Sequence, residues 1–330
     1  MTVTEIAKLA GVSKACVSRY FNHGYVSEEK RKKIKEVIEQ TGYVPSKKMQ
    51  SQLQTVKPTI GVIIPKINSE SISRVIAGIS QVLNREGYRM LLADTENSIE
   101  KEIQYLQSFK QDNLAGIIFS ATIITKQHLE LLQSLTVPLV ILSQNVPEFS
   151  CVYHDDYGAA AAMTEKLIGL KRKNYGAVLV TSEDKAAGDA RCNGFMDTMK
   201  KNHIQLNDKA ITYSDFSLES GYDAAEKLFS QAPDTEAVFC ATDTIAIGVI
   251  QYLKGIGKRI PEDVAVTGIG HSRMTEIISP TVTTAHLFYK STGSEGADML
   301  IKIIDSGIDM KNKLKMGFEV IQQELSLIHI

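Results

Sequence analysis

Residues 4–22 read TEIAKLAGVSKACVSRYFN and hold two short helical patterns on either side of a glycine. Apolar residues recur at helical spacing before Gly11, which is expected to end the first helix. Ser13 can then cap a second helix, expected over residues 14–21. Two short helices joined by a glycine turn are typical of the helix-turn-helix of DNA-binding proteins.

Three positions have the spacing that such a turn requires. Ala7 is small where the two helices cross, Gly11 can adopt the turn conformation, and Val17 can anchor the second helix to a core. A supporting third helix is expected from Ser27 to Gly42. The apolar residues that it would bury are Ile34, Val37 and Ile38. A plain three-helix bundle with a solvated basic face is the alternative.

The charge is unevenly divided along the chain. Residues 1–58 carry 11 Lys and Arg against 5 Glu, a net charge of +6, whereas residues 59–330 carry −7. A basic head on a mildly acidic body is a common footprint of nucleic-acid binding. A lysine-rich helical face is also often only solvated, so charge alone leaves both readings open.

If the second helix is the recognition helix, its exposed side chains have defined roles. Arg19 can form two hydrogen bonds to guanine, and Lys14 can reach guanine acceptors or a phosphate. Ala15 suits a thymine methyl group, and Ser18 suits a phosphate. One short helix makes few base contacts, so we expect a homodimer that binds a palindromic operator in double-stranded DNA.

Residues 4–22, followed by VSEEKRKKIKEVIEQTGYVP at 26–45, resemble the DNA-binding head of the lactose-repressor family of bacterial transcription regulators. The resemblance continues to at least Leu287. It implies a DNA-binding domain over residues 1–45, with the motif at about 4–23. The implied base-facing residues are Lys14, Ala15 and Arg19, and those at the DNA surface are Val3, Thr4, Cys16 and Ser18. Tyr25 is expected to contact DNA from a loop one residue shorter than in many members.

Residues 45–58 are polar and read as a linker, and the resemblance implies a hinge over residues 46–58. The resemblance implies a helix that folds on DNA and inserts a leucine into the minor groove. Family members usually carry that leucine seven residues after the proline, where this chain has Gln52 followed by Leu53. Either Leu53 is the wedge in a shifted register, or this hinge kinks DNA less.

From Thr59 onward, short apolar runs alternate with amphipathic segments. The runs are TIGVIIP, MLLAD, AGIIFSA, VPLVILS, YGAVLVT, EAVFCAT and DVAVTGIG, and the helices are expected at 71–86, 100–110, 159–170, 220–229 and 245–254. This alternation predicts an α/β fold with doubly wound parallel sheets in two lobes. The resemblance implies a two-lobed sensor of the periplasmic-binding-protein type (type I) over residues 59–330, which binds the effector and dimerises.

Ligands of open α/β sheets bind at the carboxyl ends of the strands, so the residues after each apolar run are candidates. Carboxylates, hydroxyls, an arginine and an aromatic ring together suit a polyhydroxylated ligand, although polar residues follow most strands. The candidate effector-binding residues are Lys66, Ser69, Ser71, Asp155, Asp156, Tyr157, Arg191, Thr242, Asp243 and His271.

The family comparison sharpens some of these positions. RCNGF matches the family's Arg-x-x-Gly-Phe, which implies that Arg191 binds effector, and Gly270 stands where many members have an effector-binding aspartate. DDYGA at 155–159 and CATDT at 240–244 resemble one branch, the trehalose-operon repressors, whose effector is trehalose 6-phosphate. Gln144 replaces an arginine expected there, so the expected effector is a disaccharide, phosphorylated or not.

The sequence argues against several other classes of protein. It has no catalytic signature, no CxxC spacing and no apolar run long enough for a membrane span, so we expect neither an enzyme nor a cofactor, metal or membrane partner. The four cysteines read as reduced thiols of a cytoplasmic protein. A sugar-binding protein or a glycoside-acting enzyme without a DNA role is the competing hypothesis.

Overall fold

The computed structural model describes residues 3–13, 16–17, 20, 27–41 and 58–324, with only the backbone of 3, 4, 28 and 29. The chain forms two compact units, residues 1–58 and residues 59–330, which we call the head and the body. In the part that the structure describes, no helix combines the length and the apolar character needed to span a bilayer.

The head contains the predicted glycine turn. Helix α1 spans Val3–Leu9 and helix α3 spans Glu28–Thr41. Gly11 has φ +63°, a left-handed conformation that glycine adopts without strain. The Ser13 hydroxyl accepts a hydrogen bond from the Cys16 N–H at 3.2 Å, which confirms the predicted cap. The buried core consists of Ile6, Ala7, Ala10, Cys16, Val17 and Ile34, with Val37 and Ile38 packed against it.

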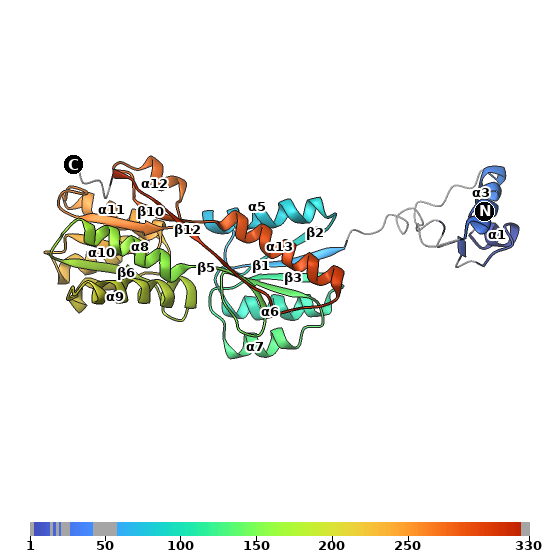
Figure 1. The fold of residues 1–330 in the computed structure, drawn as a ribbon, viewed down its shortest axis with the longest axis horizontal. Helices are drawn as coiled ribbons and strands as arrows, with labels where there is room; N and C mark the ends of the chain where they lie inside the picture. Colours follow the sequence, from blue (N-terminus) through green and yellow to red (C-terminus); the bar gives the residue numbers. More distant parts are fainter. Residues whose placement is uncertain (1–2, 14–15, 18–19, 21–26, 42–57, 325–330) are drawn as a thin grey trace. The chain divides into compact units, whose positions relative to one another are not determined.

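The body contains two six-stranded sheets, one in each of two lobes (Figure 1). The N-lobe sheet has the order β11-β5-β4-β3-β1-β2, and the C-lobe sheet has the order β12-β10-β9-β8-β6-β7. The N-lobe strands are β1 (Thr59–Ile64), β2 (Arg89–Asp94), β3 (Gly116–Ser120), β4 (Leu139–Leu142), β5 (Ser150–His154) and β11 (Lys313–Met316). The C-lobe strands are β6 (Tyr175–Leu179), β7 (Ile211–Tyr213), β8 (Ala237–Cys240), β9 (Ala265–Ile269), β10 (Thr284–Leu287) and β12 (Phe318–Ile321). Strand pairing is parallel except between β10 and β12.

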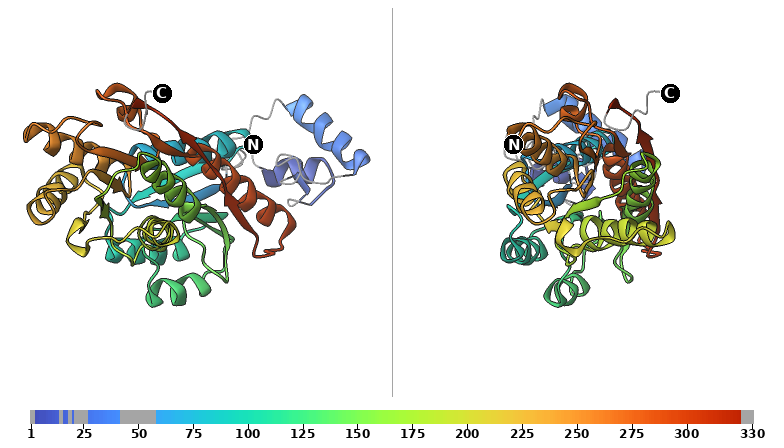
Figure 2. Two further views of the ribbon diagram at one scale, coloured as in Figure 1. Left: turned by 60° about the vertical axis from the view of Figure 1, so that its left-hand side comes forward. Right: turned by 90° about the vertical axis from the view of Figure 1, so that its left-hand side faces the viewer.

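Helices cover both faces of each sheet (Figures 1 and 2). The N-lobe helices are α5 (Glu70–Arg85) and α13 (Tyr289–Ser306) on one face, and α6 (Ile99–Gln111) and α7 (Lys126–Gln133) on the other. The C-lobe helices are α8 (Asp156–Gly169) and α9 (Arg191–Lys201) on one face, and α10 (Leu218–Gln231) and α11 (Asp243–Gly255) on the other. Shorter helices are η1 (Lys185–Ala190, a π-helix), η2 (Asp208–Ala210) and α12 (Arg273–Ile277). The predicted fold class is therefore confirmed.

Some local predictions were incomplete. The run MLLAD forms β2, but this strand lies at the edge of its sheet and Leu91 is 42% exposed, so it is not covered on both faces. Helix α8 begins three residues before the expected start at position 159. Strand β11 alternates lysine with apolar residues, and β12 includes a glutamate, so neither is a fully apolar run, because each lies at a sheet edge that is partly exposed.

Candidate effector site and DNA-binding head

Most of the predicted DNA-binding side chains lie outside the described residues. These are Lys14, Ala15, Ser18, Arg19, Tyr25 and Leu53, and the side chains of Val3 and Thr4. Cys16 is described, and it is a core residue of the head with 9% of its surface exposed. Its predicted place at the DNA surface stays a prediction, as do the other DNA contacts.

Arg191 lies in the C-lobe and is bonded to groups of the protein itself. Its Nε and Nη2 both donate to Asp156 Oδ1, at 2.8 and 2.7 Å, and its Nη1 donates to the Ala241 carbonyl at 2.5 Å. Arg191 and Asp156 are 5% and 4% exposed. Burial lowers the pKa of Arg191, but Asp156 and the Tyr289 hydroxyl outweigh this and raise it overall. The guanidinium is thus charged, buried and largely satisfied before any ligand binds.

Asp243 is the centre of a second buried group. Its carboxylate accepts hydrogen bonds from the Thr284 hydroxyl at 2.5 Å and from the Ser272 N–H at 2.7 Å. Burial raises the pKa of Asp243. A side chain at Gly270, which has φ +141°, would place its Cβ 3.3 Å from Asp243 Oδ2. A carboxylate at position 270 would lie beside that of Asp243, and the two negative charges would repel each other.

The other candidate residues of this region bond to groups that lie beside them, and they are Asp155, Tyr157, Thr242 and His271. Asp155 caps α8 by accepting from the Gly158 N–H at 3.2 Å and pairs with Lys315 at 3.0 Å. Tyr157 is 44% exposed. Its hydroxyl donates to Asp197 at 3.2 Å, and the Thr242 hydroxyl accepts from the Ile245 N–H at 3.3 Å. The His271 ring bonds His286 at 3.1 Å and Glu276 at 2.9 Å. Burial raises the pKa of Tyr289, and Arg191, Asp156 and Asp243 each act on it as well, so the structure brings these three candidates together in the C-lobe.

Several contacts that were not predicted join the lobes, among them those of Arg74 and Gln144 and the bond from the Arg273 N–H to Glu70. The Arg74 guanidinium of α5 donates to the His271 carbonyl of the C-lobe at 2.8 Å and pairs with Glu70 at 2.5 Å. Buried Gln144 donates its amide to Asp184 Oδ1 at 2.8 Å and to the Thr122 carbonyl at 2.7 Å. Burial raises the pKa of Asp184. Gln144 thus joins the lobes, and its amide is already bonded.

A shallow depression of about 560 Å³, lined by polar residues, lies at the carboxyl ends of β6 and β7, and we call it the hydroxyl recess. Its lining residues are Thr181, Ser182, Tyr213, Ser214, Asp215 and Ser220. Hydrogen bonds from Ser220 and Ser217 lower the pKa of Asp215, and Lys66 of the N-lobe lies close enough to add to this. Ser69 stands at the N-cap position of α5 without a capping side-chain hydrogen bond and bonds Ser71 at 2.9 Å. Thr181 ends a predicted strand and Ser182 follows it, so looking for polar residues at strand ends could have found both. Strand β7 is only three residues long, too short to be predicted from an apolar run.

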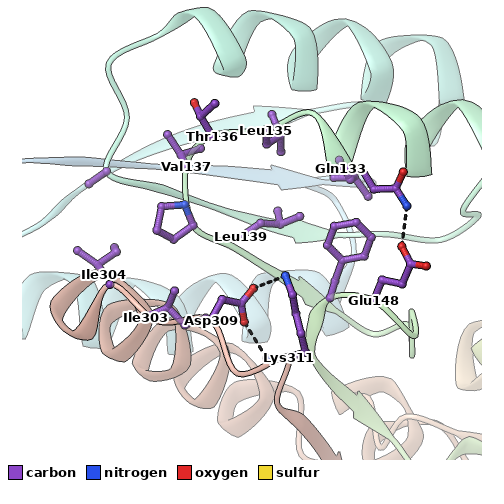
Figure 3. A pocket seen from close by; sticks show the side chains of 15 residues that line it. Gln133, Leu135, Thr136, Val137, Leu139, Glu148, Ile303, Ile304, Asp309 and Lys311 are labelled. Atoms are coloured by element: carbon purple, nitrogen blue, oxygen red, sulfur yellow. Dashed lines mark hydrogen bonds and ion pairs between the residues drawn. The ribbon is translucent and has the colours of Figure 1, made fainter.

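A second pocket of about 560 Å³ lies in the N-lobe (Figure 3). Its wall is mostly apolar, and includes Leu132, Leu139 and Ile303. The polar side chains at its edge bond one another: Gln133 donates to Glu148 at 2.6 Å, and Lys311 pairs with Asp309 at 2.8 Å. All six residues that line the hydroxyl recess are polar, and five of them carry a hydroxyl, so the recess matches the groups of a sugar more closely than this pocket does. Among the described residues, no group of three or more His, Cys, Asp or Glu is placed to hold a metal ion.

Two family models match this chain, one in the head and one in the body, and both name the same family. Residues 2–46 match the model "Bacterial regulatory proteins, lacI family", and residues 57–324 match "Periplasmic binding proteins and sugar binding domain of LacI family". The sucrose operon repressor of Staphylococcus xylosus is 32% identical over 92% of this chain and 93% of its own length. The ribose operon repressor of Bacillus subtilis (strain 168) is 28% identical over 92% of this chain and 91% of its own.

Solved structures show the same fold. A lac repressor dimer bound to operator and the anti-inducer ONPF superposes with a TM-score of 0.80 at 19% identity, covering 99% of both chains. A complex of the transcriptional regulator CelR with cellobiose has a TM-score of 0.76 at 24% identity, covering 98% of this chain and 99% of that one. By these matches, the chain belongs to the LacI family of bacterial regulatory proteins, which are DNA-binding transcription regulators and not enzymes.

Proposed function

We propose that this protein represses a sugar-utilisation operon in the bacterial cytoplasm. As a homodimer, it binds a palindromic operator through two heads, and a disaccharide in the body changes that affinity. The observation that carries the proposal is the combination of a helix-turn-helix core in the head with a hydroxyl-lined recess in the body. Relatives named as repressors of the sucrose and ribose operons support a sugar-related target.

We propose three segments for this activity. Residues 1–45 bind DNA, residues 46–58 form the hinge, and residues 59–330 bind the effector and dimerise. In the head, Arg19 and Lys14 read bases while Ser18 positions the helix on the backbone. The structure of a lac repressor dimer on operator DNA, which shares the fold over 99% of the chain, supports this arrangement.

For the effector, we propose a disaccharide of the sucrose or trehalose type. Support comes from the 32% identity to a sucrose operon repressor and from the DDYGA and CATDT motifs at 155–159 and 240–244. The sugar changes the contact between the lobes at Arg74–His271 and Gln144–Asp184, and thereby the spacing of the heads in the dimer. A coupling of about 1–3 kcal/mol would change operator affinity by roughly 5- to 150-fold.

The test measures DNA binding by fluorescence anisotropy, with a labelled fragment of the promoter next to the protein's own gene. We expect a tight complex whose affinity falls steeply with salt, because binding releases counterions from the phosphates. Sucrose or trehalose should change this affinity at constant salt. If the affinity for the promoter fragment equals the affinity for scrambled DNA of the same length, the fragment contains no operator for this protein.

A further inference from the structure

Two histidine rings of the C-lobe face each other beside the contact between the lobes. The Nδ1 atoms of His271 and His286 lie 3.1 Å apart, and the two rings are nearly perpendicular, with their centroids 5.0 Å apart. His286 belongs to β10, and His271 follows β9 in the segment 270–273. The two nitrogens are close enough for a hydrogen bond, and this bond needs one proton between them.

The geometry limits how many protons the pair can hold. Nε2 of His271 lies 2.9 Å from Glu276 Oε1, and a carboxylate only accepts, so Nε2 carries a proton. Of the two Nδ1 atoms, one must then donate and the other accept. If both rings were protonated, two N–H groups and two positive charges would face each other at this distance. The pair is thus compatible with at most one imidazolium ring.

The main chain beside His271 makes bonds that hold the lobes together. The His271 carbonyl accepts from the Arg74 guanidinium of α5 at 2.8 Å, and the Arg273 N–H donates to the Glu70 carboxylate at 3.1 Å. His271 has φ +53°, a left-handed conformation that is unfavourable for a residue with a Cβ, so its contacts must hold it there. A change in the contacts of the ring therefore acts on the bonds between the lobes.

Charged groups from several elements surround the pair. The groups near His286 are Arg74 of α5 and Glu319, its neighbour on β12, and those near His271 are Glu276 of α12 and Asp243 of α11. Burial, the His271 ring and Arg74 lower the pKa of His286, and Glu319 opposes them. His286 therefore binds a proton more weakly here than it would if the lobes separated and water reached the ring.

We infer that the His271–His286 pair is a proton-sensitive switch on the contact between the lobes. With one proton between the rings, the pair holds the segment 271–273 where it bonds Arg74 and Glu70. When mild acid protonates both rings, they repel each other and the segment moves away from α5. The inference concerns the body alone and does not depend on the proposed operator or effector.

The test is hydrogen–deuterium exchange of the full chain at pH 7.5 and 5.5, followed by mass spectrometry. The buffer contains EDTA, so that no metal ion bridges the two rings. After correction for intrinsic exchange rates, protection of residues 270–276 should fall about five- to tenfold at pH 5.5. Tenfold is roughly the limit for uptake of one proton by a histidine whose pKa is 6.5 in the open form. The buried strand β3 reports global unfolding at each pH.

His286→Asn is the informative variant. The asparagine amide reaches the position of Nδ1 and can donate or accept, but it does not titrate. Protection of residues 270–276 should therefore be the same at both pH values. His203→Asn is the matched control and should behave as the wild type, because His203 is exposed in the turn after α9, with φ +57°, which asparagine tolerates.

Three results would overturn the inference. Equal protection of residues 270–276 at both pH values in the wild type would show that protons do not act on this segment. A loss in His286→Asn as large as in the wild type would place the response elsewhere. A matching loss in β3 would assign it to global unfolding. If His286→Asn does not fold, His271→Asn removes the other ring at a φ that asparagine tolerates, and it should abolish the same pH response.

Discussion

Arg191 and Asp156 form a buried ion pair that joins two helices of the C-lobe, at the starts of α9 and α8. Removing one partner of such a pair leaves an unpaired charge away from water, and this typically costs about 3–5 kcal/mol. The arginine that the family motif assigns to the effector therefore also has a structural task in this protein.

The first prediction follows from this pair. Arg191→Met should lower the free energy of unfolding by about 3–5 kcal/mol, because Asp156 stays buried without its partner. Chemical unfolding in urea measures the change. The double variant Arg191→Met with Asp156→Leu should recover much of the loss, since it buries no charge. A single variant as stable as the wild type would show that the pair carries no net energy.

His154 gives a prediction about pH. Burial lowers the pKa of His154 from 6.5 to about 4, and its Nε2 lies 2.8 Å from the Thr292 hydroxyl. The unfolded chain therefore binds a proton that the folded protein excludes, and stability present above pH 6.5 is lost as the pH falls toward 4. The loss attributable to His154 is on the order of 3 kcal/mol. His154→Gln should flatten the stability curve over this window in urea titrations at several pH values; an identical curve would contradict the prediction.

At the scale of elements, the packing of α5 against α13 depends on two glycines. A Cβ at Gly293 would lie 2.0 Å from the Val75 carbonyl oxygen, and a Cβ at Gly78 would lie 2.0 Å from the Lys290 carbonyl oxygen. Both clashes are with backbone, which cannot move aside as a side chain can. The two helices therefore approach closely on one face of the N-lobe sheet, as Figures 1 and 2 show.

Gly293→Ala is the prediction at this scale. The added methyl group must push α13 from α5, so we expect a loss of about 3 kcal/mol or more in the free energy of unfolding. Gly169→Ala is the control, because a Cβ there has nothing within 4 Å. At this last residue of α8 alanine should be neutral or stabilise by about 0.5–1 kcal/mol. Thermal melts followed by circular dichroism compare the two, and equal melting temperatures would refute the packing argument.

At the scale of the whole molecule, a substitution in the head should affect operator binding alone, and a substitution in the body should affect sugar binding alone. Arg19→Ala is expected to abolish sequence-selective operator binding, because the guanidinium that pairs with guanine is lost, and to leave sugar binding unchanged. Asp215→Asn is expected to weaken sugar binding and to leave operator affinity without sugar unchanged. Anisotropy and calorimetry on the same preparations provide both readings. If either variant loses both activities while still folded, the assignment of DNA binding to the head and of sugar binding to the body is wrong.

Local sequence patterns alone were enough to predict the fold of the head and the fold class of the body. The spacing of Ala7, Gly11 and Val17 predicted the turn and core now described, and apolar runs such as residues 59–65 and 115–121 predicted parallel strands. These signals depend on residues close in the chain, because helical and strand periodicities repeat within a few positions. The family resemblance carried the DNA-binding assignment further than charge could.

Only the tertiary structure decided how the polar residues pair. Arg191 and Asp156 are 35 positions apart, Gln144 and Asp184 are 40 apart, and Arg74 and the His271 carbonyl are 197 apart. Sequence reasoning placed Arg191, Asp156 and Asp243 at strand ends, but not the bonds that engage them, and it did not find the recess around Asp215. Which charges neutralise each other depends on how strands and helices from distant segments come together, and no short stretch of sequence records that.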